Sequence, residues 1–565
     1  MPGPVVSMLP VRNGAIDLSG HLESVGRFAD AVVALDDGST DDTRAILEAH
    51  PLVHTVLTNP RRDSYRGWND SENRNRLLDA ALELKPSWAM SLDADELIPA
   101  DDAEALRGFL AGEADPESAY LFRVLKMMDD LGHHAGSPLW VGRLFAPRPG
   151  HRFASDHLHF VPIPTAITRD RWVKTTLRIQ HLGSLNGPRR QARLAKYREA
   201  DPDHRWQRSY DHLLDEPGLV RTWTPRSRLL PVVAHQPVID EVEVPAGQPV
   251  MSVVIISRDE EAIIERAVAA ALAQDLDDPF EVIVVTSGSD RTADLVAANH
   301  PEVTVIALDR PVLPGEARNA GWRSARGRWI TFPGSHVELR PGSLAARLAA
   351  HRWGWPMVTE TMLNGTDTRA GWASWFLDNA GLLPGRPSFA FESAPPRCSY
   401  HRDLLDEVGG FPEDMRAGED TVVNEELFDR GYGAWREDTC VTVHHSPCST
   451  AAILARHHAK RGRARARILL DARARGEITT RHMVGTALRW FPGRMRWTHM
   501  EVRRWGSDVR GQYRRSLPWI ALGATSAWGA CGIELLRSAG CPPMVKARPG
   551  SARWWSPRAG GRRTT

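Results

Sequence analysis

The same ordered set of short motifs occurs twice in this chain of 565 residues. The first set consists of Asp36-Asp37-Gly38-Ser39-Thr40 after an apolar run, then Arg74-Asn75, then Asp93-Ala94-Asp95. The second set consists of Thr286-Ser287-Gly288-Ser289 after an apolar run, then Arg318-Asn319, then Gly334-Ser335-His336. Order and approximate spacing repeat, so we expect two related domains. The paired acids that suit a divalent cation stand in the first set, and the second has Gly-Ser-His in their place.

Short apolar runs alternate with helix-like segments in both halves. The expected strands cover residues 5–8, 31–35 and 88–92, and then 251–256, 281–285 and 329–332. The helix-like segments cover residues 43–49, 75–84, 261–273 and 292–298. Strands that are apolar throughout are typical of a mostly parallel sheet covered on both faces. The alternation therefore predicts layered α/β domains.

The length of the chain predicts two or three domains, because one hydrophobic core rarely serves so many residues. An acidic segment with three prolines, residues 236–249, has the composition of a linker. We therefore expect a first domain at 1–236, a second at 250–450 and a C-terminal tail at 451–565.

The net charge of +1 hides a strong polarity along the chain. From Arg456 to the end there are 24 Lys and Arg against five Asp and Glu. A basic tail on an acidic body indicates a polyanionic partner, and arginines beside Trp519 and Trp528 favour an anionic membrane surface. Nucleic acid is disfavoured because no stacking sheet, zinc module or helix-turn-helix pattern accompanies the charge. The residues from about Ala547 are expected to be disordered.

Other features favour a cytoplasmic protein. The five cysteines show neither CxxC pairing nor zinc-ligand spacing, which fits a reducing compartment. We see no secretory signal at the N-terminus and no apolar window of the length that a confident membrane span needs. The nearest window, residues 517–536, is interrupted by Pro518, three glycines and Glu534.

The first motif set places acids where a parallel sheet binds ligands. Asp36 and Asp37 end an apolar strand. Asp93 and Asp95 follow a second apolar strand and, because they are two residues apart, project to the same face. Two carboxylates so spaced suit Mg²⁺ or Mn²⁺ bridging a diphosphate.

These three motifs in order, LDDGSTDDT, SENRNRLLDAA and SLDADEL, resemble the inverting family 2 glycosyltransferases of the GT-A fold. The resemblance implies two nucleotide-diphospho-sugar transferase domains of Rossmann-like α/β fold in tandem, followed by the helical basic tail. It implies that Asp36 and Asp37, with the Arg74-Asn75 pair, bind a nucleotide-sugar donor, and that Asp93 and Asp95 hold the metal ion. The Asp-Glu ending at Glu96 resembles the branch of the family that modifies lipopolysaccharide-type acceptors.

An inverting transfer also needs a base to take the proton of the acceptor hydroxyl. In the first domain the candidates are Asp156 and His159, with His157 beside them; both histidines equally fit ordinary strand positions. His181 is a further possible metal ligand, although a lone histidine after an apolar strand is more often structural.

In the second domain the run CSYHRDLLDEVGGF…GEDTVVNEELFDRGY resembles the acceptor side of the same family. This implies that Asp420 is the base and Glu419 supports it, while Arg318 and Asn319 stand on the donor side. A Glu-Asp pair that opens a helix also has a purely structural role at the positive end of the helix dipole. His336 and the nearby Glu338 do not restore an Asp-x-Asp.

Three interpretations of the second domain stay open: a metal-independent transferase, a transferase with a different donor, or a domain that binds acceptor without turnover. After it, His457-His458 and a run of arginines resemble the basic helix of related enzymes, which would meet a lipid-linked phosphate or simply face solvent.

We therefore expect an inverting transferase that moves sugars from nucleotide-sugar donors to hydroxyls of a glycolipid or polysaccharide in cell-envelope or exopolysaccharide synthesis. It would be peripheral at the inner face of the plasma membrane. The alternatives are a chain in which the second domain is a carbohydrate- or lipid-carrier-binding scaffold, and a nucleotidyltransferase. The last is disfavoured because no Gly-rich phosphate loop lies near the N-terminus.

Overall fold

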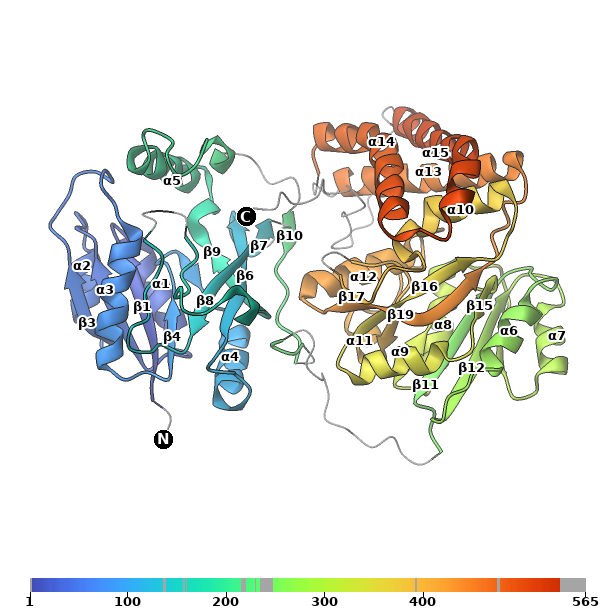
Figure 1. Ribbon diagram of the computed structural model, residues 1–565, viewed down its shortest axis with the longest axis horizontal. Helices are drawn as coiled ribbons and strands as arrows, with labels where there is room; N and C mark the ends of the chain where they lie inside the picture. The colour runs from blue at the N-terminus through green and yellow to red at the C-terminus, as the bar shows by residue number, and fades with distance from the viewer. Residues whose placement is uncertain are drawn as a thin grey trace. The chain divides into compact units, whose positions relative to one another are not determined.

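The computed structural model describes residues 3–135, 139–155, 158, 160–214, 220–228, 230–233, 247–391, 394–474 and 478–538. The chain divides into two compact units, Met1–Ala234 and His235–Thr565. Figure 1 shows the first in blue to green and the second in light green to red. Most of the expected linker, and the segment after 546 expected to be disordered, lie outside the described residues.

The first unit contains one mixed sheet. Its parallel part has the order β3-β2-β1-β4, formed by Val53–Thr58, Ala31–Asp36, Val5–Val11 and Trp88–Ser91. Antiparallel strands extend it through β8, β6, β7 and β10, which are Leu139–Phe145, Ala119–Met128, Asp130–Ala135 and Val220–Thr222. Strand β9 (Trp172–His181) pairs in parallel with β6, and β5 (Glu96–Leu97) pairs with β9.

Helices cover both faces of this sheet because successive strand residues point to opposite sides. On one side Leu9 and Val11 pack with α1 (Ala15–Val25), α2 (Thr43–Ala49) and α4 (Ala100–Gly112). On the other side Val6 and Met8 pack with α3 (Asp70–Glu83). Helix α5 (Gly187–Ala200) follows β9 directly in the chain.

The second unit repeats the strand order of the first. Its sheet runs β13-β12-β11-β14-β18-β16-β19-β15, with the same parallel and antiparallel pairings as β3-β2-β1-β4-β8-β6-β9-β5. In this order the strands are Thr304–Leu308, Phe280–Ser287, Met251–Ser257, Trp329–Thr331, Ser399–His401, Met357–Asn364, Ala434–His444 and Val337–Leu339. A short strand, β17 (Phe389–Ala390), pairs with β19. The expected fold class, two α/β domains in tandem with a helical C-terminal region, is confirmed.

The registers of the two sheets match as well. Val5 of β1 pairs with Trp88 of β4, and Met251 of β11 pairs with Trp329 of β14. Counting onward from the two tryptophans brings Asp95 and His336 to the same place in their sheets.

The helices of the second unit differ from those of the first at one functionally important point. The shared helices are α6 (Ile264–Leu272), α7 (Thr292–Asn299), α8 (Pro314–Ser324) and α9 (Ser343–Arg352). Between β18 and β19 the chain forms α11 (Arg402–Glu407) and α12 (Glu419–Arg430). The described part of the matching connection in the first unit, between β8 and β9, contains only the short 3-10 turn Arg169–Arg171.

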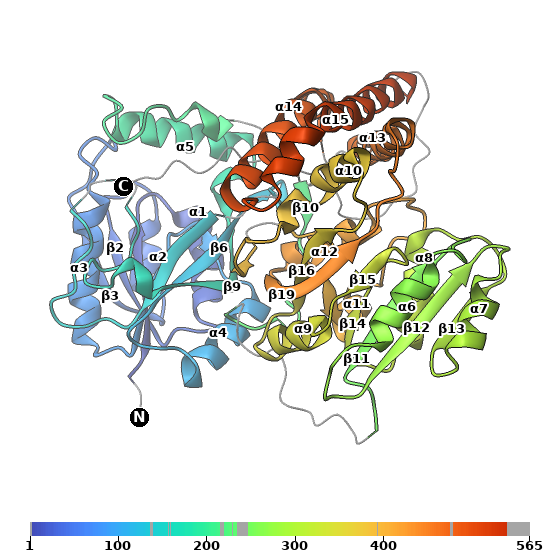
Figure 2. The same cartoon turned by 45° about the vertical axis from the view of Figure 1, so that its right-hand side comes forward.

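The basic C-terminal region packs onto the second unit. Helices α13 (Ala451–Ala474), α14 (Thr480–Trp505) and α15 (Arg510–Ser538) gather beside α10 (Arg369–Asn379), as Figure 2 shows. Phe376 of α10, Leu454 of α13 and Ile520 of α15 belong to one buried cluster. Helices α13 and α15 approach so closely that a Cβ on Gly462 would lie 1.9 Å from the carbonyl oxygen of Ala527.

Candidate active site

Asp36 is the last residue of β2 and Asp37 follows it, and the two side chains make different contacts. Asp37 is buried and accepts a hydrogen bond from Asn59 Nδ2 at 2.5 Å, and it also pairs with Arg62. It therefore fixes the loop that follows β3. Asp36 accepts a hydrogen bond from the backbone N–H of Ser39 at 3.0 Å. Because Asp37 is committed to the loop, Asp36 is the better candidate for contact with a nucleotide.

Arg74 of α3 joins the donor-side motifs of the first unit. It is buried and donates to Asp70 at 3.0 Å, to Ser91 at 2.5 Å and to Asp93 at 2.5 Å. Arg143 of β8 contacts the other oxygen of Asp93 at 3.2 Å. Burial would raise the pKa of Asp93, but these two guanidinium groups outweigh burial and hold it well below the usual range. Asp93 is thus a fixed anion.

Arg143 also links Asp93 to Glu96. Its guanidinium donates to Glu96 Oε1 at 2.5 Å, and Glu96 Oε2 accepts from the backbone N–H of Asp93 at 3.1 Å. Burial and the nearby charges of Asp93 and Asp95 raise the pKa of Glu96 to about 7, against the opposing effect of Arg143. The side chain of Glu96 is almost completely inaccessible. Glu96 therefore stabilises the backbone of the Asp-Ala-Asp motif and is not available to a ligand.

Asp95 faces His181 at the end of β9, with Asp95 Oδ2 3.6 Å from His181 Nε2. Its pKa is lowered, because the charges of His181 and of Arg193 and Lys196 on α5 outweigh burial and the repulsion of Asp93. A Cβ on Gly183 would lie 2.7 Å from Asp95 Oδ2, so glycine leaves the space beside this carboxylate open.

The carboxylates of Asp93 and Asp95 suit a hard divalent cation as ligands. Asp93 and Asp95 have side chains 36% and 31% exposed, so a ligand can reach both carboxylates. Mg²⁺ and Mn²⁺ take oxygen ligands and usually bind through one or two carboxylates plus substrate phosphates. His181 is less suited as a third ligand, since its Nδ1 accepts from the backbone N–H of Gly183 at 3.2 Å and its proton therefore belongs on Nε2, toward Asp95.

In the Arg-Asn pair of the second unit, the asparagine makes the same contact as in the first unit and the arginine makes a different one. Asn75 Oδ1 accepts from the backbone N–H of Phe153 at 2.9 Å, and Asn319 Oδ1 accepts from that of Phe411 at 2.8 Å. The asparagine therefore anchors the matching loop in both units.

Arg318 does not repeat the contacts of Arg74. Phe332 and Gly334 stand where the first unit has Ser91 and Asp93, and Arg318 packs over the Phe332 ring at 5.4 Å. Its Nε donates instead to Glu419 Oε1 at 3.1 Å. Equivalent arginines thus bind Asp93 in the first unit and Glu419 in the second.

Helix α12 presents the Glu-Asp pair at its first turn. Gly418 precedes it with φ +90°, which favours glycine. Glu419 is buried, and desolvation together with Asp420 raises its pKa against the pull of Arg318. Asp420 is more open, and its carboxylate accepts the backbone N–H of Thr421 at 2.8 Å. The accessible member of the pair is therefore Asp420.

The other residues singled out from the sequence are engaged in other contacts, are buried, or lie outside the described residues. Glu338 pairs with Arg266 at 3.2 Å and His445 at 2.8 Å, so it is already engaged. Asp156, His157 and His159 lie outside the described residues. Thr286 and Ser287 are buried at the end of β12.

Three basic or histidine residues were not predicted from the sequence: Arg143, which contacts Asp93; Arg397, which donates to Asn379 Oδ1 at 2.6 Å; and His444, whose ring packs against that of His336. Arg143 and His444 lie on strands without a recognisable motif, and Arg397 immediately precedes the CSYHRD segment. A basic residue in an otherwise apolar strand, such as Arg143 in LWVGRLF, is the one local signal that marks them.

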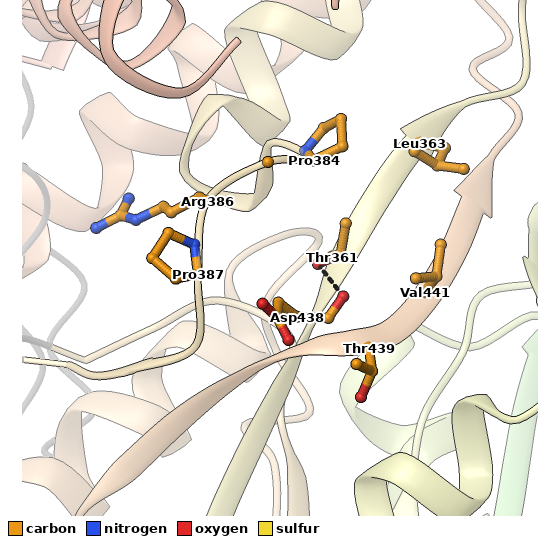
Figure 3. Close-up of a pocket in the computed structure, with 9 residues that line it drawn as sticks. Thr361, Leu363, Pro384, Arg386, Pro387, Asp438, Thr439 and Val441 are labelled. Carbon is orange, nitrogen blue, oxygen red and sulfur yellow. Dashed lines mark hydrogen bonds between the residues drawn. The ribbon is translucent and has the colours of Figure 1, made fainter. Parts of the chain in front are cut away.

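Figure 3 shows a cavity of about 510 Å³ in the second unit, between β16, β19 and the segment 384–387. Thr361 donates to the carbonyl oxygen of Asp438 at its floor, at 2.9 Å. None of the predicted site residues lines it, so it is separate from the motif-bearing edge.

Comparison with known proteins agrees with this geometry. Residues 252–407 match the family model described as Glycosyl transferase family 2. This part of the chain is a family 2 glycosyltransferase domain. The first unit repeats the strand order of this domain, so the chain consists of two α/β units of the same topology followed by helices.

The relatives cover parts of the chain. Uncharacterized proteins of Mycobacterium tuberculosis and Mycobacterium bovis are each 28% identical over 235 residues, which is 38% of this chain and 57% of theirs. The chain thus spans little more than half the length of these relatives. The succinoglycan biosynthesis protein ExoO of Rhizobium meliloti is 41% identical over 111 residues, 20% of this chain and 30% of ExoO.

Two solved structures are also similar. TarS residues 1–349 of S. aureus shows a TM-score of 0.29 at 17% identity, over 51% of this chain and 91% of that one. The mannosyltransferase PcManGT of Pyrobaculum calidifontis, in complex with GDP-Man and Mn²⁺, shows a TM-score of 0.35 at 17% identity, over 52% and 88%.

Proposed function

We propose that the chain transfers a sugar, with inversion, from a nucleotide-sugar donor to a hydroxyl of a glycolipid or polysaccharide. The observation that carries the proposal is that the arginine of the Arg-Asn pair binds a different acid in each unit. Arg74 fixes Asp93 in the first unit, and Arg318 fixes Glu419 in the second. The similarity to ExoO, a protein named for succinoglycan biosynthesis, supports a polysaccharide pathway.

On the donor side, the first unit would bind the nucleotide through Asp36 and hold Mg²⁺ or Mn²⁺ through Asp93 and Asp95. When bound, the ion supplies positive charge to the departing diphosphate. Arg74 and Arg143 keep Asp93 anionic and fixed, and Gly183 keeps the space beside Asp95 open.

On the acceptor side, Asp420 would take the proton of the attacking hydroxyl. The buried Glu419 and its partner Arg318 position the first turn of α12. The described part of the first unit has no counterpart of α12, and the bases expected there from the sequence, Asp156 and His159, lie outside the described residues.

The decisive experiment is donor hydrolysis and transfer profiling of the full chain. We expect both Asp95→Asn and Asp420→Asn to lower turnover by about 100-fold or more, the size of a general-base or charge-stabilisation effect. The matched controls are Asp63→Asn and Asp414→Asn, exposed acids of the same units, which should keep wild-type rates. Unchanged turnover in both site variants would refute the two-site proposal.

The alternative, a second unit that binds a carbohydrate or lipid carrier without turnover, is favoured by its missing acid pair. It predicts that Asp95→Asn abolishes turnover while Asp420→Asn leaves the rate unchanged and alters acceptor KM alone.

We also propose that the chain is cytoplasmic and associates peripherally with an anionic membrane. Helix α15 is long and apolar enough to cross a membrane by length and composition alone, and 28% of its most apolar window is buried. Large apolar side chains on α14 and α15 are exposed, including Leu488, Trp528 and Leu536, and Arg514 and Arg515 lie nearby in sequence. Flotation should show binding to vesicles of phosphatidylglycerol and little binding to phosphatidylcholine; equal binding to both would contradict the electrostatic part.

A further inference from the structure

His336 occupies the position that Asp95 holds in the first unit. The backbone N–H of Leu182 donates to the carbonyl oxygen of Asp95 at 2.8 Å, and that of His445 donates to the carbonyl oxygen of His336 at 2.9 Å. The partner across the gap is also equivalent, since His181 and His444 end β9 and β19. The Asp95–His181 pair is therefore replaced by a His336–His444 pair.

The two histidines carry no negative charge to this place. Their rings lie edge to face with centroids 4.9 Å apart. Burial and nearby arginines lower the pKa of His336 to about 4 and that of His444 well below its usual range. Both are neutral at pH 7, so a hard cation loses the anionic oxygens that Asp93 and Asp95 provide.

A basic helix follows this strand in both units. In the first unit Arg193 and Lys196 of α5 act on Asp95. In the second, α13 follows β19 and turns His457 and Arg461 toward Asp378 of α10, at 3.8 and 3.3 Å. The Arg461 side chain is 49% exposed and Asp378 only 9%, so Arg461 can also reach a ligand.

Arg397 brings a second guanidinium to the same place. It has φ +53° and donates to Asn379 Oδ1 at 2.6 Å. Its charge acts on Asp378, Asp420 and His336, and its partner Asn379 is next in the chain to Asp378, which pairs with Arg461. A backbone held in the left-handed region at a non-glycine residue is uncommon and costs energy.

A transition metal is the competing occupant, because ligand atoms of Asp378, His457 and His458 lie within 4.8 Å of one another. The surroundings oppose it. Asp378 is the one acid of the three, and its carboxylate is already paired with Arg461. His457 Nε2 accepts from Arg461 Nε at 3.3 Å, which occupies the lone pair that a metal would need. The charges of Arg397 and Arg494 add to the repulsion of a cation.

We propose that the second unit binds the phosphate groups of a diphosphate-bearing ligand without a metal ion, with Arg397 and Arg461 in the role that the cation has in the first unit. This inference rests on the proposed function. Guanidinium groups form charge-assisted hydrogen bonds with phosphate oxygens and keep their charge at any physiological pH. The diphosphate can come from a nucleotide-sugar donor or from a lipid carrier, because both present the same group.

The test uses the full chain carrying Asp95→Asn, which removes a metal acid of the first unit. Calorimetric titration in EDTA with UDP, GDP and farnesyl diphosphate separates the two sources. We expect at least one probe to bind, Arg461→Gln to weaken it about tenfold or more, and Arg456→Gln to change it less than about twofold. Arg456 is the matched control, an exposed arginine on another face of α13.

Nucleotide binding would assign the place to a donor, and farnesyl diphosphate binding alone would assign it to a carrier. Binding that appears only after Mn²⁺ or Zn²⁺ is added, or equal effects of the two arginine variants, would overturn the inference. Absence of binding by every probe would overturn it too. In that case Mn²⁺-dependent nucleotide binding by the wild-type chain would leave the proposed donor site of the first unit intact.

Discussion

Gly315 of α8 offers a sharp test of how the second unit positions its base. A Cβ at this residue would lie 1.8 Å from the carbonyl oxygen of Pro412 and 2.7 Å from its carbonyl carbon. Both are backbone atoms, and the segment must move by more than about 1 Å to reach ordinary van der Waals contact. That segment is tied to α8 by two hydrogen bonds of 2.8 Å between Asn319 and the backbone of Phe411, and it leads to Asp420.

The expected magnitude of Gly315→Ala follows from these contacts. Overpacking costs about 1–3 kcal/mol, and weakening two hydrogen bonds adds about 1 kcal/mol each. Replacing glycine by alanine in a helix returns about 1 kcal/mol. The net loss of unfolding free energy is therefore about 2–4 kcal/mol, and a base displaced by about 1 Å lowers turnover by about 100-fold.

Denaturant unfolding of the full chain and acceptor-dependent transfer measure the two effects. Gly529→Ala is the control, because a Cβ there meets nothing within 4 Å. It should stabilise the chain by about 1 kcal/mol through helix propensity and leave transfer unchanged. If Gly315→Ala behaves like Gly529→Ala, the close approach of α8 to the 411–413 segment is wrong.

Two further predictions concern one residue in each unit. Gly183→Ala would place a Cβ 2.7 Å from Asp95 Oδ2 and 2.5 Å from His181 Cε1, so titration should show Mn²⁺-dependent nucleotide binding weakened by about tenfold; unchanged affinity would exclude Asp95 as a ligand. His351 is buried and its pKa is lowered to about 3 by desolvation, so the unfolded chain binds its proton first as the pH falls below 6.5. Stability is then lost toward acid, by about 2 kcal/mol at pH 5, and His351→Gln should remove that part of the difference in unfolding free energy between pH 7.5 and pH 5; an unaltered difference would contradict the neutral buried histidine.

The repeated sheet could be predicted because the same motifs follow the corresponding apolar strands, in the same order, in both halves of the chain. Asp93, Asp95 and Arg74 could be found because each lies at a strand or helix end with a recognisable spacing. Arg143 could not, since its contact with Asp93 joins positions fifty residues apart through an antiparallel strand pair. Local patterns do not encode such pairings.

The tail shows a different limit of sequence reasoning. His457 and His458 are adjacent in a basic helix, which is compatible with a solvated face as well as with a site. Tertiary packing distinguishes them: His458 is buried under α15, where a Cβ on Gly523 would lie 3.1 Å from its ring. His457 turns toward Asp378. The distinction depends on helices α10 and α15, which carry no motif of their own.

The matched registers also show which side chains an acid pair would meet in the second unit. An aspartate placed at Gly334 would find Phe332 where the first unit has Ser91, and buried Cys398 where the strand pairing places Arg143. Arg318 would have to abandon Glu419 to neutralise it. An acid at residue 334 would therefore need changes at three other residues before it could be held as Asp93 is held in the first unit. An Asp-x-Asp at residues 334 and 336 would meet the charges of Arg397 and Arg461, and it would lack the Ser91 and Arg143 neighbours that hold Asp93 and its arginine in the first unit.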